Sequence, residues 1–322
     1  MKKYLIIQSI LIYFIISCNK TESIVFKESK HLYTDTIPFN AIFHPTFITL
    51  TDSILVFSSY NTDPLLHFYK TPHLKYMYGT GRKGQNFDEF QAFPMICQNS
   101  RSNKLHIWGY TPIKINEFIF TNDSFKLSKS HILDKYNTFN QLHIVRDSLF
   151  IYNSVPTELS IKKYNLKLKK ETGSINFDLD SNNQPFYSSN YGLVSANDSF
   201  IVYAYTYKKQ IDIYNISTLE LNKRIIDKYN FKNPIINDNE NNTEHYINII
   251  SGKKYFYALH RGKSSKNTTF NTDIIEVFDY NGNPILKYSF DISPQIFIVD
   301  EENRYMYGYN NKYEDYILRY KL

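Results

Sequence analysis

The 322-residue chain has only two cysteines, Cys18 and Cys97. So few cysteines exclude the disulfide framework that stabilises many small secreted domains. The fold must therefore depend on a hydrophobic core, and a chain of this length can bury a large one. Cys97 ends the apolar, strand-like segment 93–97, where we predict a buried structural thiol rather than a nucleophile.

Long apolar runs are also missing after residue 16. A helix that crosses a membrane needs about 20 apolar residues, whereas the run over residues 4–16 is shorter and contains Gln8 and Ser9. The formal net charge of +6 is too small to predict nucleic-acid binding. We therefore expect a body without membrane spans and without a nucleic-acid partner.

Catalytic signatures are absent as well. The sequence has no His-Glu-x-x-His, Gly-x-Ser-x-Gly or Cys-x-x-Cys motif, each of which would bring metal ligands or a nucleophile together. The nine histidines are scattered, and we expect those in strand-like segments, such as His67, His106 and His143, to be structural. The sequence predicts no catalytic residue, no metal site and no cofactor.

The N-terminus carries the features of a bacterial lipoprotein signal. Lys2 and Lys3 precede the apolar run, and the small residue Ser17 stands directly before Cys18. A basic start, an apolar stretch and a small residue at the cleavage site mark a secretory signal. A cysteine just after that site is the acceptor for lipid, so we predict that Cys18 is lipidated.

This signal divides the chain into three parts. We predict that residues 1–17 are a signal peptide, that residues 18–22 are a lipidated tether, and that residues 23–322 form a single domain. Loss of the two lysines lowers the formal charge from +6 to +4. The tether has no strong acidic run that would direct export to the cell surface. We therefore expect an outer-membrane lipoprotein that faces the periplasm, and surface exposure stays open.

Aromatic residues dominate the rest of the chain, with 29 tyrosines and 24 phenylalanines against 10 glycines and one tryptophan. Such residues favour strands, and the Asn and Asp residues between the runs favour turns. A turn pair, a short apolar strand, a loop and an aromatic-rich strand recur six times, beginning at residues 52, 103, 147, 198, 252 and 303. Spacings of 44 to 54 residues are typical of four-stranded propeller blades.

The repeats predict the fold class, which is an all-β, six-bladed β-propeller of four-stranded blades. The sixth copy reaches residue 322 after its third strand, so a strand from elsewhere must complete this blade. Residues 23–33 contain apolar side chains and belong to no other copy. We predict that they close the ring, which leaves no long edge exposed. A β-sandwich with a second domain is the alternative, but sandwiches do not repeat at this period.

A glycine-rich segment lies between the first two copies. Gly79, Gly81 and Gly84 have the spacing G-x-G-x-x-G, which in dinucleotide-binding folds precedes a helix that receives a pyrophosphate. Here residues 85–94 lack helical periodicity and end on a proline. We therefore predict an inter-blade loop.

This segment resembles the glycine-rich loop of the TolB-like, NHL-related six-bladed β-propeller lipoproteins of Bacteroidota, which reads roughly G-x-G-x-x-G-Q-G-P-G-E-F. The chain shares the three glycines, Gln85, Glu89 and Phe90, whereas residues 86–88 replace the Gly-Pro-Gly centre. The lipoprotein signal, the length and the six repeats are similar too. The resemblance implies the fold and an envelope location, and it implies almost nothing about activity.

In propellers, the loop between the second and third strands of a blade lies on the same face as the loop that leads to the next blade. On this face the sequence places basic side chains that could bind an anion. They are Arg82, Lys83, Lys208, Lys209, His260, Arg261, Lys263 and Lys266. Arg82 and Arg261 are the preferred contacts because a guanidinium pairs with carboxylate or phosphate through two hydrogen bonds. An ordinary solvated basic loop is the alternative.

The sequence thus favours a ligand- or protein-binding propeller module that a lipid anchors to the envelope membrane. Its expected partners are that membrane and an anionic glycan, a lipid head group or an envelope protein. The alternative is a propeller hydrolase or lyase that acts on envelope or dietary glycans or on lactones. Such an enzyme would need acidic residues or histidines that converge at the channel mouth.

Overall fold

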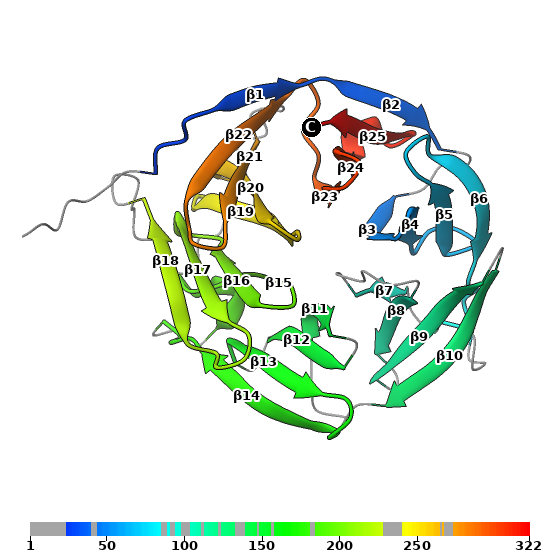
Figure 1. Cartoon of the computed structure of the whole chain (residues 1–322), viewed down its shortest axis with the longest axis horizontal. Coiled ribbons are helices and arrows are strands. Elements are labelled where there is room, and N and C mark those ends of the chain that lie inside the picture. The colour runs from blue at the N-terminus through cyan, green and yellow to red at the C-terminus, as the bar shows by residue number, and fades with distance from the viewer. Residues whose placement is uncertain are drawn as a thin grey trace, which may run out of the picture.

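The computed structural model describes residues 24–39, 44–84, 89–90, 94–97, 104–110, 113–121, 124–132, 139–146, 148–155, 158–180, 184–227, 240–264, 266 and 273–322. The predicted signal peptide, Cys18 and the tether lie outside these residues. Six sheets are arranged in a ring around a central channel (Figure 1). The predicted all-β, six-bladed propeller is therefore confirmed.

The first three blades each contain four antiparallel strands. Blade one consists of β3 (Pro45–Thr51), β4 (Ile54–Ser59), β5 (Leu66–Lys70) and β6 (Lys75–Thr80). Blade two consists of β7 (Met95–Ile96), β8 (Lys104–Tyr110), β9 (Ile113–Thr121) and β10 (Ser124–Ile132). Blade three consists of β11 (Phe139–Val145), β12 (Leu149–Ser154), β13 (Ser160–Asn165) and β14 (Lys170–Asn176).

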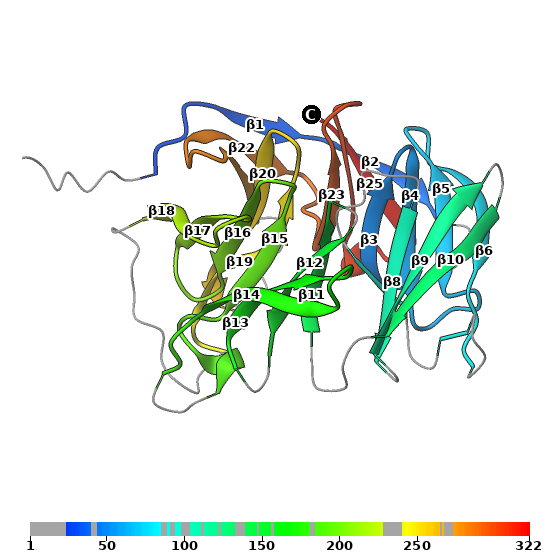
Figure 2. The ribbon, with the colours of Figure 1, turned by 60° about the horizontal axis from the view of Figure 1, so that its bottom comes forward.

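The other three blades follow the same order from the channel outwards. Blade four consists of β15 (Gly192–Ala196), β16 (Phe200–Tyr205), β17 (Gln210–Asn215) and β18 (Leu221–Ile226). Blade five consists of β19 (Thr243–Ser251), β20 (Tyr255–Ser264), β21 (Ile274–Asp279) and β22 (Pro284–Phe290). Blade six begins with β23 (Ile296–Asp300), β24 (Tyr305–Tyr309) and β25 (Tyr316–Lys321). The strands run from one face of the ring to the other (Figure 2).

The N-terminal part of the chain closes the ring, although not with the predicted residues. β2 (Thr34–Pro38) pairs antiparallel with β25 and completes blade six. β1 (Ser29–Leu32) pairs parallel with β22 and is a fifth strand on blade five. Closure by an N-terminal strand is thus confirmed, but its assignment to residues 23–33 is wrong. The two strands together cross the outer edges of blades five and six (Figure 1).

The error has a physical reason. The apolar residues that suggested a closing strand pack elsewhere, because Ile24 and Phe26 lie against the core between blades four and five. The Phe26 ring meets the Phe278 ring edge-on, with centroids 5.2 Å apart. The strand that closes blade six is an outer edge strand. Such a strand tolerates an exposed Asp35 and a terminal Pro38, because one of its sides needs no backbone partner.

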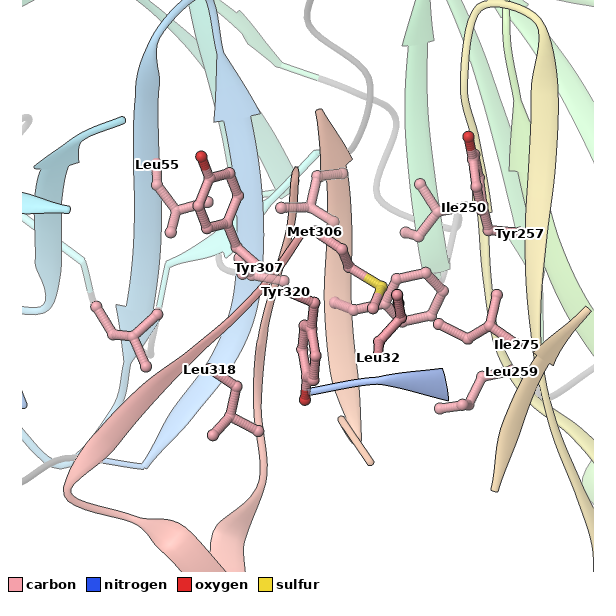
Figure 3. Packing of buried hydrophobic residues seen from close by; sticks show 14 of the residues in the cluster. Leu32, Leu55, Ile250, Tyr257, Leu259, Ile275, Met306, Tyr307, Leu318 and Tyr320 are labelled. Carbon is pink, nitrogen blue, oxygen red and sulfur yellow. The ribbon is translucent and has the colours of Figure 1, made fainter. Parts of the chain in front are cut away.

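The hydrophobic core is divided among the interfaces between blades. Its largest cluster joins blades five, six and one, and includes Tyr257, Tyr307 and Leu55 (Figure 3). Another cluster contains Cys97, which is 2 % exposed and lies with Trp108. Burial raises the pKa of the Cys97 thiol well above its ordinary value, so the prediction of a buried structural thiol is confirmed.

The described helices are the short 3-10 turns η1 (Pro185–Tyr187) and η3 (Asn311–Tyr313). Within the described part of the chain, no helix has the length and apolar character needed to cross a membrane.

Hydrogen bonds from backbone N–H groups to side-chain oxygens join the innermost strands of neighbouring blades. Val194 N–H donates to Gln141 Oε1 over 2.7 Å, which joins blades three and four. Ser251 N–H donates to Ser195 Oγ over 2.8 Å, which joins blades four and five. These bonds fix the strands that surround the channel.

Candidate functional site

A cavity of about 660 Å³ lies at one end of the channel and continues between blades five and six. Its inner lining comes from the innermost strands β3, β11 and β15, and its outer lining from β22 and from Lys30 on β1. We call this cavity the inter-blade groove. Strand β1 therefore borders its outer end.

The groove lies on the face opposite the predicted basic side chains. Its lining includes the turns between the first and second strands of three blades, at Asp52, residues 252–254 and residues 301–304. Successive strands are antiparallel, so these turns lie at the other end of the blade from the loop between its second and third strands. The two candidate sites are thus distinct surfaces.

The inner end of the groove contains buried polar groups. Thr49 is 0 % exposed and His143 is 1 % exposed, and both line the groove together with Ser251. Thr49 Oγ1, His143 Nδ1 and Ser251 Oγ are buried and have no hydrogen-bond partner among the described residues. Other buried side-chain atoms of the described residues, among them Ser58 Oγ and Asn153 Oδ1, are in the same position, so such atoms are not confined to the groove.

The protonation of His143 follows from its other ring nitrogen. Nε2 lies 2.8 Å from the Val194 carbonyl oxygen. A carbonyl can only accept a hydrogen bond, so Nε2 must carry the proton. Burial lowers the pKa of His143 to about 4, against the opposing effect of the Val194 carbonyl. At neutral pH the ring is therefore uncharged, and Nδ1 is an acceptor.

The walls of the groove combine polar and charged side chains with apolar and aromatic ones. Tyr255 and Tyr257 of β20 and Tyr288 of β22 contribute aromatic rings, while Ile285 and Leu286 of β22 contribute aliphatic side chains. Burial and the nearby Glu301 carboxylate raise the pKa of the Tyr257 hydroxyl. The volume of the groove lies within the usual range of small-molecule sites, about 300–1,000 Å³.

The charges along the groove are balanced. Among the described lining residues there are four basic and four acidic side chains, namely Lys30, Lys253, Lys254 and Arg304 against Asp52, Asp300, Glu301 and Glu302. Two of the carboxylates are already bound by nearby groups. Asp300 accepts hydrogen bonds from the backbone and side-chain nitrogens of Asn303, over 3.0 and 2.8 Å.

The Glu301 carboxylate binds the turn between β19 and β20. Its Oε2 accepts from the N–H groups of Lys253 at 2.7 Å and Lys254 at 3.1 Å. Its Oε1 accepts from the N–H of Tyr255 and the hydroxyl of Tyr257, both at 3.2 Å. This carboxylate therefore connects blade six to blade five at the mouth of the groove.

Half of the eight predicted basic residues on the other face are paired with acidic side chains. Arg261 Nη1 lies 2.5 Å from Glu244 Oε2, and Arg261 Nε lies 3.6 Å from Asp273 Oδ2. Lys263 Nζ lies 3.8 Å from Asp273 Oδ1, and Lys266 Nζ lies 2.9 Å from Glu240 Oε2. These pairs offset the positive charge that the sequence suggested.

One of the two predicted blade-four residues, Lys209, contributes to a buried polar network. Lys209 Nζ lies 3.5 Å from Asp227 Oδ2 and 3.4 Å from Glu276 Oε1, and Glu276 is 0 % exposed. Its neighbour Lys208 donates to Asn190 Oδ1 over 2.6 Å. The structure thus brings the blade-four and blade-five residues together, but into contacts within the protein.

His260 lies in the same region and is mostly buried. Its ring centroid is 5.7 Å from that of His245 and 5.5 Å from that of Tyr246. Burial, together with the positive charges of Lys209 and Lys287, lowers the pKa of His260 to about 3. His260 is therefore uncharged at neutral pH and adds no positive charge to the predicted rim.

The glycine-rich loop keeps Arg82 and Lys83 exposed, at a different position around the ring from blade five (Figure 1). Gly81 has φ +82°, which glycine adopts readily, and the buried Phe90 packs beside it. Phe90 N–H donates to the Arg82 carbonyl over 2.9 Å. This loop joins blades one and two, and anion binding by its two cations stays a prediction.

The described residues contain no group of three or more His, Cys, Asp or Glu side chains that could hold a metal ion.

The groove residues were missed because no local motif marks them. Thr49, His143 and Ser251 come from three blades and are far apart in the sequence. The strands themselves give no signal either, because each contains other polar residues, such as Thr51, Gln141 and Asn248.

The structure is a six-bladed β-propeller whose last blade contains strands from both ends of the chain. A family model described as TolB-like 6-blade propeller-like matches residues 20–302. The chain therefore belongs to the TolB-like six-bladed propeller family.

Solved structures agree with this fold. A protein from Bacteroides fragilis that is described as exported is similar with a TM-score of 0.58 and 11 % identity, over 93 % of this chain and 99 % of that one. Raptor from Chaetomium thermophilum matches with a TM-score of 0.49 and 9 % identity, over 83 % of this chain and 22 % of that one, which is too low for any argument. No curated protein matches the chain.

Proposed function

We propose that this protein is a lipid-anchored binding module of the cell envelope and that it holds its ligand in the inter-blade groove. The anchor would be Cys18, which follows a basic start, an apolar run and Ser17. The fold shared with an exported Bacteroides protein supports an envelope location. We expect attachment to the outer membrane on its periplasmic side.

The observation that carries the binding role is the groove itself. It brings apolar and aromatic side chains together with charged and polar ones around one cavity. A ligand that fills the cavity would bury the apolar part of this lining, and removal of apolar surface from water contributes about 25 cal/mol per Å². The polar and charged side chains would fix the orientation of the ligand.

A thermal-shift screen with the processed protein tests this role, using glycan fragments, lipids and peptides of the envelope. Each ligand that raises the melting temperature is measured again with two variants. Leu286→Arg puts a large charged side chain into the groove, and Arg82→Ala is the control on the opposite face. We expect the shift to disappear with Leu286→Arg and to persist with Arg82→Ala. A shift that persists with Leu286→Arg and disappears with Arg82→Ala would indicate that the ligand binds the basic face.

Metabolic labelling with a fatty-acid analogue tests the anchor separately. The wild-type protein should take up the label and the Cys18→Ala variant should not. Equal labelling of the two proteins would exclude Cys18 as the lipid acceptor, while leaving the role of the groove to the thermal-shift result.

A further inference from the structure

We infer that the membrane lies against the outer rim of blades five and six, along residues 24–33, which we call the N-terminal strap. The ring then stands on its edge, and both of its faces stay open to ligands. This inference rests on the anchor proposed at Cys18, and it adds which surface of the propeller that anchor holds against the lipid. Three observations support it, namely the length of the tether, the path of the strap and the side chains that the strap exposes.

The tether between the anchor and the propeller is short. Only five residues separate Cys18 from Ile24, the first residue of the strap. A fully extended chain spans at most about 3.3–3.6 Å per residue, so a lipid at Cys18 holds Ile24 within about 20 Å of the membrane surface. The surface of the propeller around Ile24 is therefore the part that stays closest to the lipid.

The strap lies on the outside of the ring. Ile24 and Phe26 pack against the core between blades four and five, and Lys287 Nζ of β22 lies 4.6 Å from the centroid of the Phe26 ring. Lys287 N–H donates to the Glu28 carbonyl over 3.0 Å, and β1 then continues along β22. The strap thus follows the outer rim rather than a face of the ring (Figure 1). A bilayer close to Ile24 therefore meets the rim first.

The side chains that the strap exposes suit the surface of a bilayer. Val25 is 65 % exposed and Tyr33 is 76 % exposed, and Lys27 between them is exposed as well. Tyrosine has an apolar ring and a polar tip, and lysine has an apolar stem and a charged head, so both can lie at the boundary between lipid tails and head groups. The Tyr33 ring also meets the His31 ring edge-on, with centroids 4.8 Å apart.

The charge of the strap is compatible with a lipid surface but is too small to explain the contact alone. Lys27 and Lys30 stand against Glu28, and a lysine close to an anionic membrane contributes about 1 kcal/mol. The anchor therefore supplies the attachment, and the strap determines which side of the ring faces the lipid.

Quenching of tryptophan fluorescence by brominated phospholipids tests the inference. The protein that begins at Cys18 is coupled through this thiol to a maleimide lipid in vesicles of phosphatidylethanolamine and phosphatidylglycerol, and Cys97 is buried and should not react. Tyr33→Trp and Val25→Trp place the probe on the strap, and the wild-type protein gives the background emission of the buried Trp108. We expect brominated lipid to quench both added tryptophans.

The matched control is Ile132→Trp. Ile132 is 75 % exposed and ends β10, the outermost strand of blade two, on the other side of the ring from β1 (Figure 1). We expect brominated lipid to leave its emission unchanged. Absence of quenching on the strap, or equal quenching at Ile132, would overturn the inference.

Metabolic labelling distinguishes this failure from failure of the proposed anchor, because the maleimide coupling does not depend on lipidation in the cell. Normal labelling of the wild type together with equal quenching at Tyr33 and Ile132 would refute only the orientation. Equal labelling of the wild type and Cys18→Ala would refute the anchor, and this inference with it.

Discussion

The carboxylate of Glu301 occupies the space where a side chain on Gly252 would lie. A Cβ atom on Gly252 would be 2.3 Å from Glu301 Oε1 and 2.6 Å from its Cδ, far closer than two such atoms can approach. Glycine therefore allows the blade-six carboxylate to reach the three backbone N–H groups of the blade-five turn. The contact joins the two blades that form the inter-blade groove.

We predict that Gly252→Ala destabilises the protein. The added methyl group displaces the Glu301 carboxylate and breaks its hydrogen bonds to the turn. Because hydrogen bonds to a charged group contribute more than neutral ones, the free energy of unfolding should fall by about 2–4 kcal/mol. Urea denaturation measures this change.

The neighbouring Glu302→Ala serves as the control, since Glu302 is exposed and should change stability by no more than about 0.5 kcal/mol. Glu301→Ala should reproduce most of the loss seen with Gly252→Ala. If Gly252→Ala were as stable as the wild type, the Glu301 contact would not hold the two blades together.

Two truncations should separate the roles of β1 and β2. A chain that begins at residue 34 loses β1 and the packing of Phe26, but keeps the strand that closes blade six. We expect this chain to fold with a lower melting temperature. A chain that begins at residue 39 also loses β2 and exposes the edge of β25, which we expect to cause aggregation. Size-exclusion chromatography and thermal melting distinguish the two. Equal behaviour of both chains would contradict the closure of blade six by β2.

Stability should decrease in mild acid because of buried histidines. Burial lowers the pKa of His143 and of His245 to about 4 and that of His260 to about 3, whereas a histidine in an unfolded chain titrates near about 6.5. Between these values the unfolded chain binds more protons than the folded one. The free energy of unfolding should therefore fall as the pH drops from about 6.5 towards 4, and these groups should add no pH dependence above that range.

Replacement of His260 with Asn tests whether this histidine contributes to the loss of stability in mild acid. It removes one of the titrating groups, so the difference in unfolding free energy between about pH 8 and about pH 5 should become smaller than in the wild type. The variant is compared with itself at the two pH values, which cancels any loss of packing that is independent of pH. An unchanged difference would show that His260 titrates alike in the folded and unfolded chains.

The fold could be predicted from the sequence because its evidence is local and repeated. Turn residues such as Asp147 and Asp198 precede an apolar strand in successive copies, and each copy forms the same part of a blade. The closing strand could not be predicted in the same way. It is selected by the free edge of β25, and a polar segment such as residues 34–38 can pair with that edge as well as an apolar one.

The candidate site was harder to predict, because it depends on contacts between distant segments. The positive charges of Arg261 and Lys209 are visible in the sequence, but their partners Glu244 and Glu276 become neighbours only when the strands are in register. The groove depends even more on the ring. The ring nitrogen of His143 that carries the proton is determined by the Val194 carbonyl of the next blade, and this contact exists only in the folded ring.

The double variant Arg82→Ala/Arg261→Ala shows whether the ligand binds in the inter-blade groove or on the opposite, basic face. We expect it to leave binding in the inter-blade groove within about two-fold of the wild type, because both arginines lie on the opposite face. Loss of the partly buried Arg261–Glu244 pair should still lower the free energy of unfolding by about 1 kcal/mol, and the single variant Arg82→Ala should not. Calorimetric titration and urea denaturation of the same preparations separate these effects. A large loss of affinity in the double variant, with normal binding by Leu286→Arg, would instead show that the ligand binds the basic face that the sequence suggested.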